Sequence, residues 1–506
     1  MRCTMPKTHN RWLVLIAVLV AFVPIVIDMT ILHIAVPSLT LALGASGTEI
    51  LWIIDIYPLI MAGLLVPMGT LADRVGHKRM LLTGLAIFLV ASVIAAFAPT
   101  ASVLIGARLL LAIGASMVMP NILAIIRQTF DDANERAMAL GLWGTIGGAG
   151  AAFGPLVGGF LLEHFWWGSV FLINVPVMAI VWPLAYFVVP KRKPEGTAEW
   201  KFGQALALIL GLIATVYALK SGFKPDSSVI TSLSIAAIGL ALIAWFVRQQ
   251  LRSATPMLDM SLLQTPAIVA GVVMALVVTG ALAGVELTIA QELQFVVGRS
   301  PLQAGLFMMP LVIASAIGGP VAGYLVKYVG LKWLAPASLL IAALALSVLG
   351  VSDFHHPGVT VYLMMAMLGL ALSIGLTASS IAIMSNAPAD KAGAAGSLEG
   401  TGYELGAGLG ISLFGVLLTN IYATNLRVPE GLAALVPANA KDSIGETMLA
   451  TQSLGDQAGL LEQAARLAFS SAHQTVLLSA ATIVAVLAIG VGFALRNYST
   501  PEQSAH

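Results

Sequence analysis

The sequence predicts an all-α membrane protein, and three observations support this. Of the 506 residues, 58% are hydrophobic and only 10% are charged. The mean hydropathy is +0.94, so the composition excludes a soluble protein. Apolar stretches of about 20 residues, the length that spans the hydrocarbon core, recur along the chain. No stretch alternates polar and apolar residues as barrel strands do, so we expect helices.

The chain contains about fourteen such stretches, taken in order. They cover residues 12–37, 49–71, 79–98, 101–126, 136–162 and 167–189, then 202–220 and 228–247, then 266–290, 303–326, 332–350, 360–385, 394–422 and 472–496. The first stretch exceeds the roughly 7–15 residues of a signal-peptide core and lacks a small-residue cleavage site. We therefore expect it to remain as the first spanning helix.

The distribution of Lys and Arg predicts the orientation. With the N-terminus in the cytoplasm, about three-quarters of the Lys and Arg fall on the cytoplasmic side, as the positive-inside rule requires. The few on the other side include Lys220, at the end of the stretch 202–220. An even number of crossings then leaves both termini in the cytoplasm.

A partial repeat predicts two halves. Gly69-Thr-Leu-Ala-Asp-Arg-Val-Gly-His-Lys is echoed by Gly323-Tyr-Leu-Val-Lys-Tyr-Val-Gly-Leu-Lys, and duplicated halves around a midplane site are a transporter architecture. We expect residues 1–190 to form an N-terminal six-helix bundle and 191–260 a linker with two inserted helices. Residues 261–506 should form the C-terminal bundle. Its outer loop, 425–471, is expected to hold a helix or two.

Acidic residues inside apolar stretches are the main functional signal. Asp28, Asp55, Glu286, Glu399 and Glu404 all lie in predicted spans, Asp28 near the midplane and Asp55 about one-third of the way in from outside. An acid at the centre of a span costs about 2.5–3.5 kcal/mol on insertion scales. It therefore needs an aqueous cavity, a partner or a role with protons or cations. We expect these carboxylates to face a wet central cavity, with Glu286 as a secondary cation site.

Two of these acids lie close together on one helix. Glu399 and Glu404 are about 140° apart around an ideal helix, so one should face the cavity and the other a helix interface, unless Gly400 and Gly402 distort the helix. Glu404 is nearer the midplane and ranks first. Tyr403 is a candidate for lining the substrate site.

Three further residues could bind or carry charge. Arg108 needs a carboxylate such as Asp28 or Asp55, unless it snorkels to the interface. Trp52 and Tyr57 bracket Asp55, and their ring faces could hold a cation with about 0.5–2 kcal/mol each. Trp52 could equally be an interfacial belt residue.

Two polar residues near the predicted outer ends have plainer interpretations. His33 follows Asp28 towards the outer end of the first span, where an interfacial histidine is favoured over a proton relay. Glu292 lies just beyond the span that contains Glu286 and is expected to be a solvated loop residue.

Two glycine motifs complete the pattern. The loop Gly69-Thr-Leu-Ala-Asp73-Arg74-Val-Gly76-His-Lys-Arg combines glycines for tight turns with an acid and bases that could latch helix ends together. In the stretch 136–162, Gly150, Gly154, Gly158 and Gly159 allow close helix approach, and Pro155 bends the helix. An ordinary basic loop and a generic packing face are the alternatives.

Together these strings resemble the fourteen-helix drug–proton antiporters of the major facilitator superfamily, over the whole chain. The resemblance implies the major facilitator fold, with two six-helix bundles plus two inserted helices. It also implies proton-coupled export of quaternary ammonium compounds, cationic dyes and biocides across the bacterial inner membrane. The family's coupling carboxylates map onto Asp28, Asp55, Glu399 and Glu404. Relatives that handle dications carry an acid in the tenth helix, whereas residues 303–326 have none.

Other classes of function find little support in the sequence. A net charge of +1 argues against nucleic acid as a partner, and the eight histidines and single cysteine show no metal-ligand spacing. Without a phosphate-cradling loop we expect neither an enzyme nor an ATP-driven pump. The expected partners are cationic drugs, protons and the lipid bilayer, with no cofactor and a monomeric state. The alternatives are an exporter of a native metabolite or another antibiotic, and a non-transporting sensor on this scaffold.

Overall fold

The computed structural model describes residues 10–130, 132–192, 200–222, 228–253, 256–388, 391–432 and 435–496, and its regular elements there are all helices. The first six spans are α1 (Arg11–Leu43), α2 (Gly47–Val75), α3 (His77–Ala96), α4 (Ala101–Thr129), α5 (Ala133–His164) and the pair α6 (Ser169–Leu172) and α7 (Asn174–Val188). The inserted spans are α8 (Phe202–Gly222) and α9 (Val229–Arg252). The last six are α10 (Pro266–Gln291), α11 (Pro301–Val329), α12 (Leu331–Gly350), α13 (Val359–Met384), α14 (Ala392–Asn425) and α16 (Ala458–Ala494).

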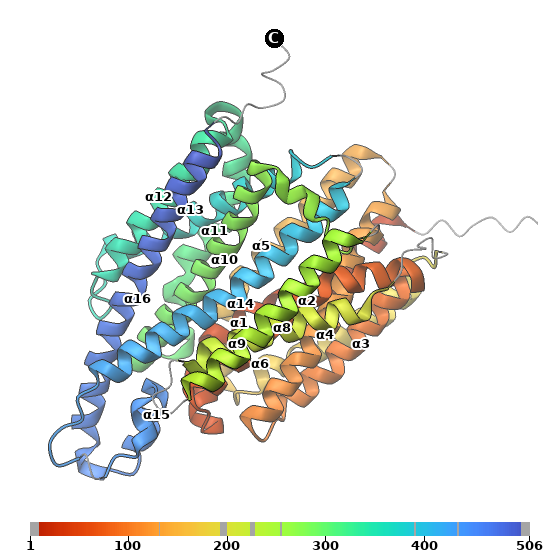
Figure 1. The fold of residues 1–506 in the computed structure, drawn as a ribbon. Helices are drawn as coiled ribbons and strands as arrows, with labels where there is room; N and C mark the ends of the chain where they lie inside the picture. The colour runs from red at the N-terminus through yellow and green to blue at the C-terminus, as the bar shows by residue number, and fades with distance from the viewer. Residues whose placement is uncertain are drawn as a thin grey trace, which may run out of the picture.

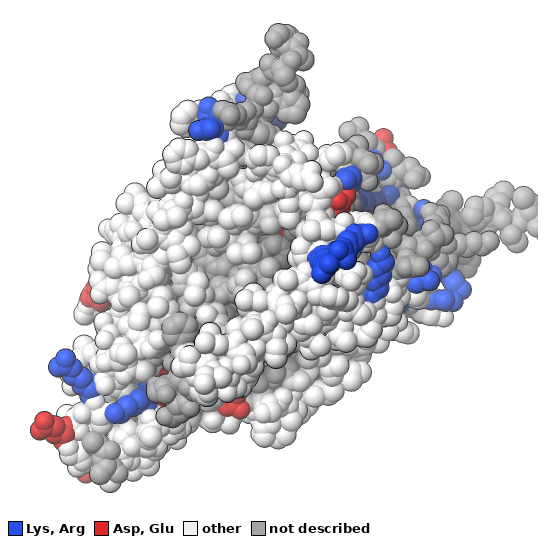
Figure 2. Space-filling view, in the orientation of Figure 1, with Lys and Arg blue, Asp and Glu red and all other residues white. Residues whose placement is uncertain are grey.

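The predicted all-α membrane fold is confirmed. Thirteen helices in the described ranges are long and apolar enough to cross a membrane. The remaining span is the glycine-rich α5. On the face shown in Figure 2, charged side chains gather at the two ends of the helices and leave an uncharged band between them. A multi-pass membrane protein has this distribution, because charges avoid the hydrocarbon.

Helix starts follow local capping rules. The Ser46 hydroxyl oxygen accepts a hydrogen bond from the Glu49 backbone N–H at the start of α2. The Glu49 carboxylate accepts one from the Ser46 backbone N–H, which completes a capping box. Ser300 and Gln303 do the same for α11, where Pro301 occupies the first helical position. These caps satisfy backbone donors that would otherwise lack partners at the helix ends.

Two buried apolar clusters correspond to the two bundles. One includes Phe22, Phe88 and Leu111 and contains residues of all the helices from α1 through α7. The other includes Leu339 and Phe469 and contains residues of the helices from α10 through α16. Figure 1 shows α2–α4 on one side of the molecule and α11–α13 with α16 on the other. The bundles meet mainly where α2 packs on α14 and α5 on α11, while α8 packs on α9, α2 and α14.

Two elements differ in extent from the sequence expectation. The sixth span divides at Ile173 into α6 and α7. The last span was expected to begin at residue 472, but α16 begins at Ala458, because the Ala- and Leu-rich end of the outer loop continues the same helix. The rest of that loop contains a short helix, α15 (Ile444–Thr451). Two 3₁₀ turns, η4 (Ala438–Lys441) and η5 (Gly455–Gln457), flank α15.

Five glycines of α5 lie at its contacts with α1 and α11, namely Gly147, Gly150, Gly154, Gly158 and Gly159. A Cβ atom at Gly150 would lie 3.1 Å from the Val26 side chain, and one at Gly159 would lie 2.7 Å from the Leu302 Cα atom. Because the second neighbour is backbone, it cannot rotate away. Gly159 therefore permits a close approach between the two bundles at the α5–α11 contact.

We expect Gly159→Ala to lower stability by about 1–3 kcal/mol, the usual cost of overpacking a tight contact. Gly141→Ala on the same helix is the matched control, because a Cβ atom there meets nothing within 4 Å. Thermal unfolding of the purified variants in detergent measures both. Equal melting temperatures for the two variants would show that the α5–α11 contact accommodates the added methyl group without loss of stability.

Candidate functional site

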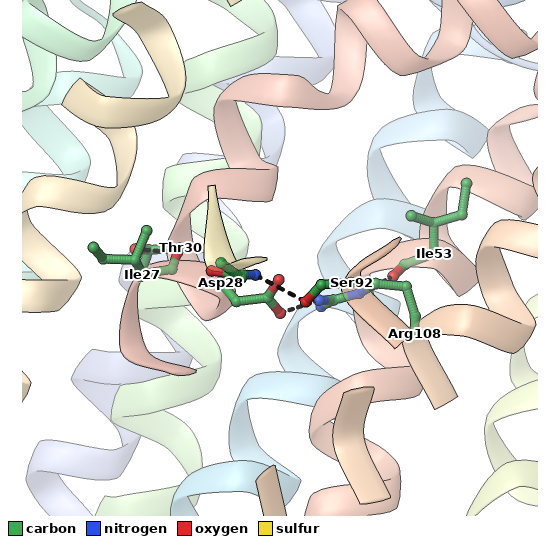
Figure 3. A network of polar contacts seen from close by, with 7 residues as sticks. Ile27, Asp28, Thr30, Ile53, Ser92 and Arg108 are labelled. Atoms are coloured by element: carbon green, nitrogen blue, oxygen red, sulfur yellow. Dashed lines mark hydrogen bonds and ion pairs between the residues drawn. The ribbon is translucent and has the colours of Figure 1, made fainter. Parts of the chain in front are cut away.

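Asp28 of α1 forms a buried ion pair with Arg108 of α4. The two side chains are 0% and 1% exposed, and an Arg108 terminal nitrogen donates a hydrogen bond to Asp28 Oδ2. Figure 3 shows the two side chains pointing towards each other between their helices. Arg108 Nε also donates to the Ile53 carbonyl oxygen of α2 at 3.1 Å, and the guanidinium lies 4.5 Å from the centre of the Tyr57 ring. Arg108 does not snorkel, and its carboxylate partner is Asp28.

Asp55 of α2 forms a second buried ion pair, with Lys220 of α8. Lys220 Nζ lies 2.6 Å from Asp55 Oδ2, and the side chains are 2% and 0% exposed. The Ser412 hydroxyl of α14 donates a hydrogen bond to the same carboxylate oxygen. The Lys220 ammonium also lies 3.9 Å from the centre of the Trp52 ring. Three helices therefore meet at Asp55.

Lys220, counted among the outer charges because it ends an apolar stretch, is buried in the last turn of α8 and pairs with Asp55. A lysine at such a position normally reaches the interface. The sequence signal for this pair was that Asp55, an acid within a span, needed a partner.

The expected wet surroundings of Asp28 and Asp55 are wrong in this structure. Each carboxylate is enclosed and neutralised by a fixed cation that lies against an aromatic ring of α2. The ring faces of Trp52 and Tyr57 do hold cations, but these belong to the protein itself. Truncating one partner of such a pair typically costs about 3–5 kcal/mol, because it leaves a buried charge uncompensated.

Glu404 of α14 differs from these two acids. It is 5% exposed, and among the described residues its Oε2 atom has no hydrogen-bond partner and no Lys, Arg or His pairs with it. Glu404 lies on α14, the helix that packs on α2. It is thus an acid at the contact between the bundles with no fixed counter-charge among the described residues.

Glu399 is partly exposed and hydrogen-bonded within its own helix. The Tyr403 hydroxyl, one turn further along α14, donates to Glu399 Oε1 at 2.5 Å. Tyr403 is thus a partner of Glu399, in addition to its expected place near the substrate site. Glu404 and Glu399 occupy different environments, as their angular separation indicated.

His33 and Glu292, expected at the interface and in a loop, are both buried, so these expectations are wrong. His33 of α1 lies 3.1 Å from Glu286 of α10, at 4% and 8% exposure, and this contact joins the two bundles. Glu292 begins a π-helical turn, η2 (Glu292–Val296), which turns its side chain towards α16. There the Ser470 hydroxyl donates to Glu292 Oε1 at 2.7 Å.

The loop between α2 and α3 links its acid to a histidine. Asp73 lies 3.5 Å from His77, and His77 in turn lies 2.7 Å from the Asn121 side chain of α4. Arg74 is exposed. Gly76 adopts φ 105°, a conformation that other residues rarely take, so the turn requires glycine. Gly69 lies on the same stretch of α2, with Pro120 of α4 nearby.

The described residues contain no group of three or more His, Cys, Asp or Glu arranged to hold a metal ion. Six of their buried ionisable groups instead form three pairs across helices, Asp28–Arg108, Asp55–Lys220 and His33–Glu286. Glu404, Glu292 and His473 are buried without a charged partner in the described part of the chain. Such groups can bind or exchange charge.

Comparison with known proteins identifies the family of the chain. Residues 18–289 and 269–436 match the Major Facilitator Superfamily. The methyl viologen resistance protein SmvA of Salmonella typhimurium is 46% identical over 96% of this chain and 98% of its own length. The multidrug efflux pump LfrA of Mycolicibacterium smegmatis is 36% identical over 97% of this chain and 98% of its own length.

The fold is also that of solved transporters. A bacterial homologue of the human lysosomal transporter Spinster, solved in an inward-facing and unoccupied conformation, aligns with a TM-score of 0.71 at 18% identity, covering 98% of this chain and 100% of that one. The expected resemblance is therefore confirmed at the level of sequence and of fold. The chain belongs to the Major Facilitator Superfamily.

Proposed function

We propose that this protein is a drug efflux transporter that exports lipophilic cations in exchange for protons. Its cargo would include quaternary ammonium compounds, cationic dyes and biocides. It would act in the bacterial cytoplasmic membrane with both termini in the cytoplasm. The names of the relatives, a methyl viologen resistance protein and a multidrug efflux pump, support drug efflux.

The single observation that carries the proposal is Glu404. Asp28 and Asp55 already have fixed cations, whereas Glu404 is a buried acid with no cationic partner among the described residues. A buried carboxylate must be neutralised, by a proton or by a bound cation. Glu292 is also buried without a cation, but it is hydrogen-bonded to Ser470 of α16. Glu404 lies on α14, where the two bundles pack together. We therefore assign the competition between proton and drug to Glu404.

Competition at one carboxylate is sufficient for exchange. A proton binds Glu404 from the outside, and the protein then opens to the cytoplasm. A lipophilic cation displaces the proton there and is carried out. Exchange of one proton for one monovalent cation moves no net charge, so it runs on the pH difference alone.

The short helix α15 packs against α1 and the start of α2, at the end of the molecule that we assign to the outside. The Gly47 backbone N–H at the start of α2 donates to Glu446 Oε2 of α15 at 3.2 Å. Burial raises the pKa of the Glu446 carboxyl above its usual value. A Cβ atom at Gly445 would strike Thr40 of α1, so α15 packs tightly over this end. Exchange requires this contact to open when the cavity faces outward.

Export can be tested with purified protein in liposomes that contain trapped DNA. An acidic lumen stands for the outside, and ethidium fluorescence reports accumulation. We expect accumulation that a proton ionophore abolishes. A panel of cationic, neutral and anionic compounds then separates cation export from export of a native metabolite or another antibiotic. Folded protein that moves no cation under any gradient would contradict the proposal and favour a sensor.

A further inference from the structure

The Asp55 site has the chemistry of a binding site for organic cations. A carboxylate and the face of a tryptophan together attract an ammonium group, by charge and by the ring quadrupole. In this structure the ligand of that site is the ammonium group of Lys220, 2.6 Å from the carboxylate and 3.9 Å from the ring centre. The protein thus supplies its own cation to the site.

Lys220 is held much less firmly than Arg108. Arg108 contacts Asp28, the Ile53 carbonyl oxygen and the Tyr57 ring, and its planar group fixes several donors at once. Lys220 contacts Asp55 and Trp52 with a single point charge on a flexible stem. It lies two residues before the end of α8 at Gly222, so its stem can reach the outer interface without moving the helix.

The position of the site ties it to the transport cycle. Asp55 belongs to the N-terminal bundle, and Ser412, which donates to it, belongs to α14 of the C-terminal bundle. Separation of α2 from α14 breaks this hydrogen bond and loosens the Asp55–Lys220 pair. The inserted helix α8 packs on both α2 and α14, so Lys220 remains within reach throughout.

We propose that Lys220 is a tethered cation that occupies Asp55 and Trp52 when no substrate is bound, and that the transported cation displaces it. This inference rests on the proposed function and adds to the exchange acid Glu404 a second site that recognises the cation. A tethered group has an effective concentration on the order of millimolar. Weakly binding ions are therefore excluded. Lipophilic cations with aromatic or quaternary groups succeed, because they gain contact with Trp52.

The test measures binding of tetraphenylphosphonium, a lipophilic cation, to purified full-length protein without any gradient. Lys220→Met removes the competitor, so we expect binding about tenfold tighter than in the wild type. Lys220→Arg replaces it with a stronger competitor that pairs in two places and stacks on the ring, so binding should weaken. Asp55→Asn in the Lys220→Met background should remove the gain.

If Lys220→Met does not fold, Lys220→Arg remains as the test, because the arginine variant keeps the ion pair with Asp55. The inference would be overturned if folded Lys220→Arg bound tetraphenylphosphonium with wild-type affinity. It would also be overturned if folded Lys220→Met bound this cation no tighter than the wild type does. A purely structural lysine would not improve binding when removed. If proteoliposomes fail to export while binding still responds to residue 220, the proposed function fails and this inference stands.

A second measurement uses the wild-type protein. A lipophilic amine-reactive ester should label Lys220 faster when tetraphenylphosphonium is saturating, because the displaced ammonium group becomes accessible. Most ligands protect the residues they contact, so this direction of change is diagnostic. Lys441, exposed in the outer loop, should react at the same rate with and without ligand. Protection of Lys220, or no change, would contradict displacement.

Discussion

Glu404→Gln is expected to lower the initial rate of proton-driven dye export by about 30-fold or more, in a protein that still folds. Glutamine has the same shape but cannot bind or release a proton, and it cannot neutralise a cation. Losing one partner of a buried charge pair typically costs about 2–5 kcal/mol, and 2 kcal/mol corresponds to about 30-fold. Ethidium accumulation in the proteoliposomes described above measures the rate.

Glu399→Gln is the matched control on the same helix. Glu399 is partly exposed, and glutamine can still accept the hydrogen bond from Tyr403. We therefore expect only a small decrease in export. Two results would contradict the assignment of the exchange site to Glu404. One is normal export by folded Glu404→Gln, and the other is an equal loss in Glu399→Gln.

The difference between Glu404 and the other acids shows which features of the site could be predicted from the sequence. Hydropathy predicted which residues lie in the membrane, and the need of a buried acid for a partner predicted that Asp28 and Asp55 are functional candidates. The pattern also identified Arg108 and the two rings of α2. These conclusions depend on composition and local spacing, which the sequence contains.

Pairing between distant helices could not be predicted in the same way. Lys220 and Asp55, or His33 and Glu286, meet only through the rotation of each helix about its axis and the packing of one helix on another. Hydropathy fixes depth but not rotation, and a basic residue near a helix end fits burial and snorkelling equally well. The π-helical turn that buries Glu292 has no sequence signal that we can identify.

The ion pair between Asp28 and Arg108 leads to the largest expected effect on stability. Arg108→Gln leaves Asp28 buried without a cation, so we expect a loss of about 3–5 kcal/mol. Asp28→Asn leaves the Arg108 guanidinium uncompensated and should cost a similar amount. The double variant removes both charges and should be more stable than either single variant. Thermal or denaturant unfolding in detergent, compared across the four proteins, gives the interaction energy.

The double variant also separates a structural role from a role in coupling. If Asp28 takes part in proton exchange, Asp28→Asn/Arg108→Gln will fold but export dye slowly, because the carboxylate that binds the proton is gone. If it folds and exports at the wild-type rate, the pair only holds α1 to α4. In that case Glu404 alone carries the exchange. Additive losses in the two single variants would instead show that the buried charges do not depend on each other, contrary to their contact in the structure.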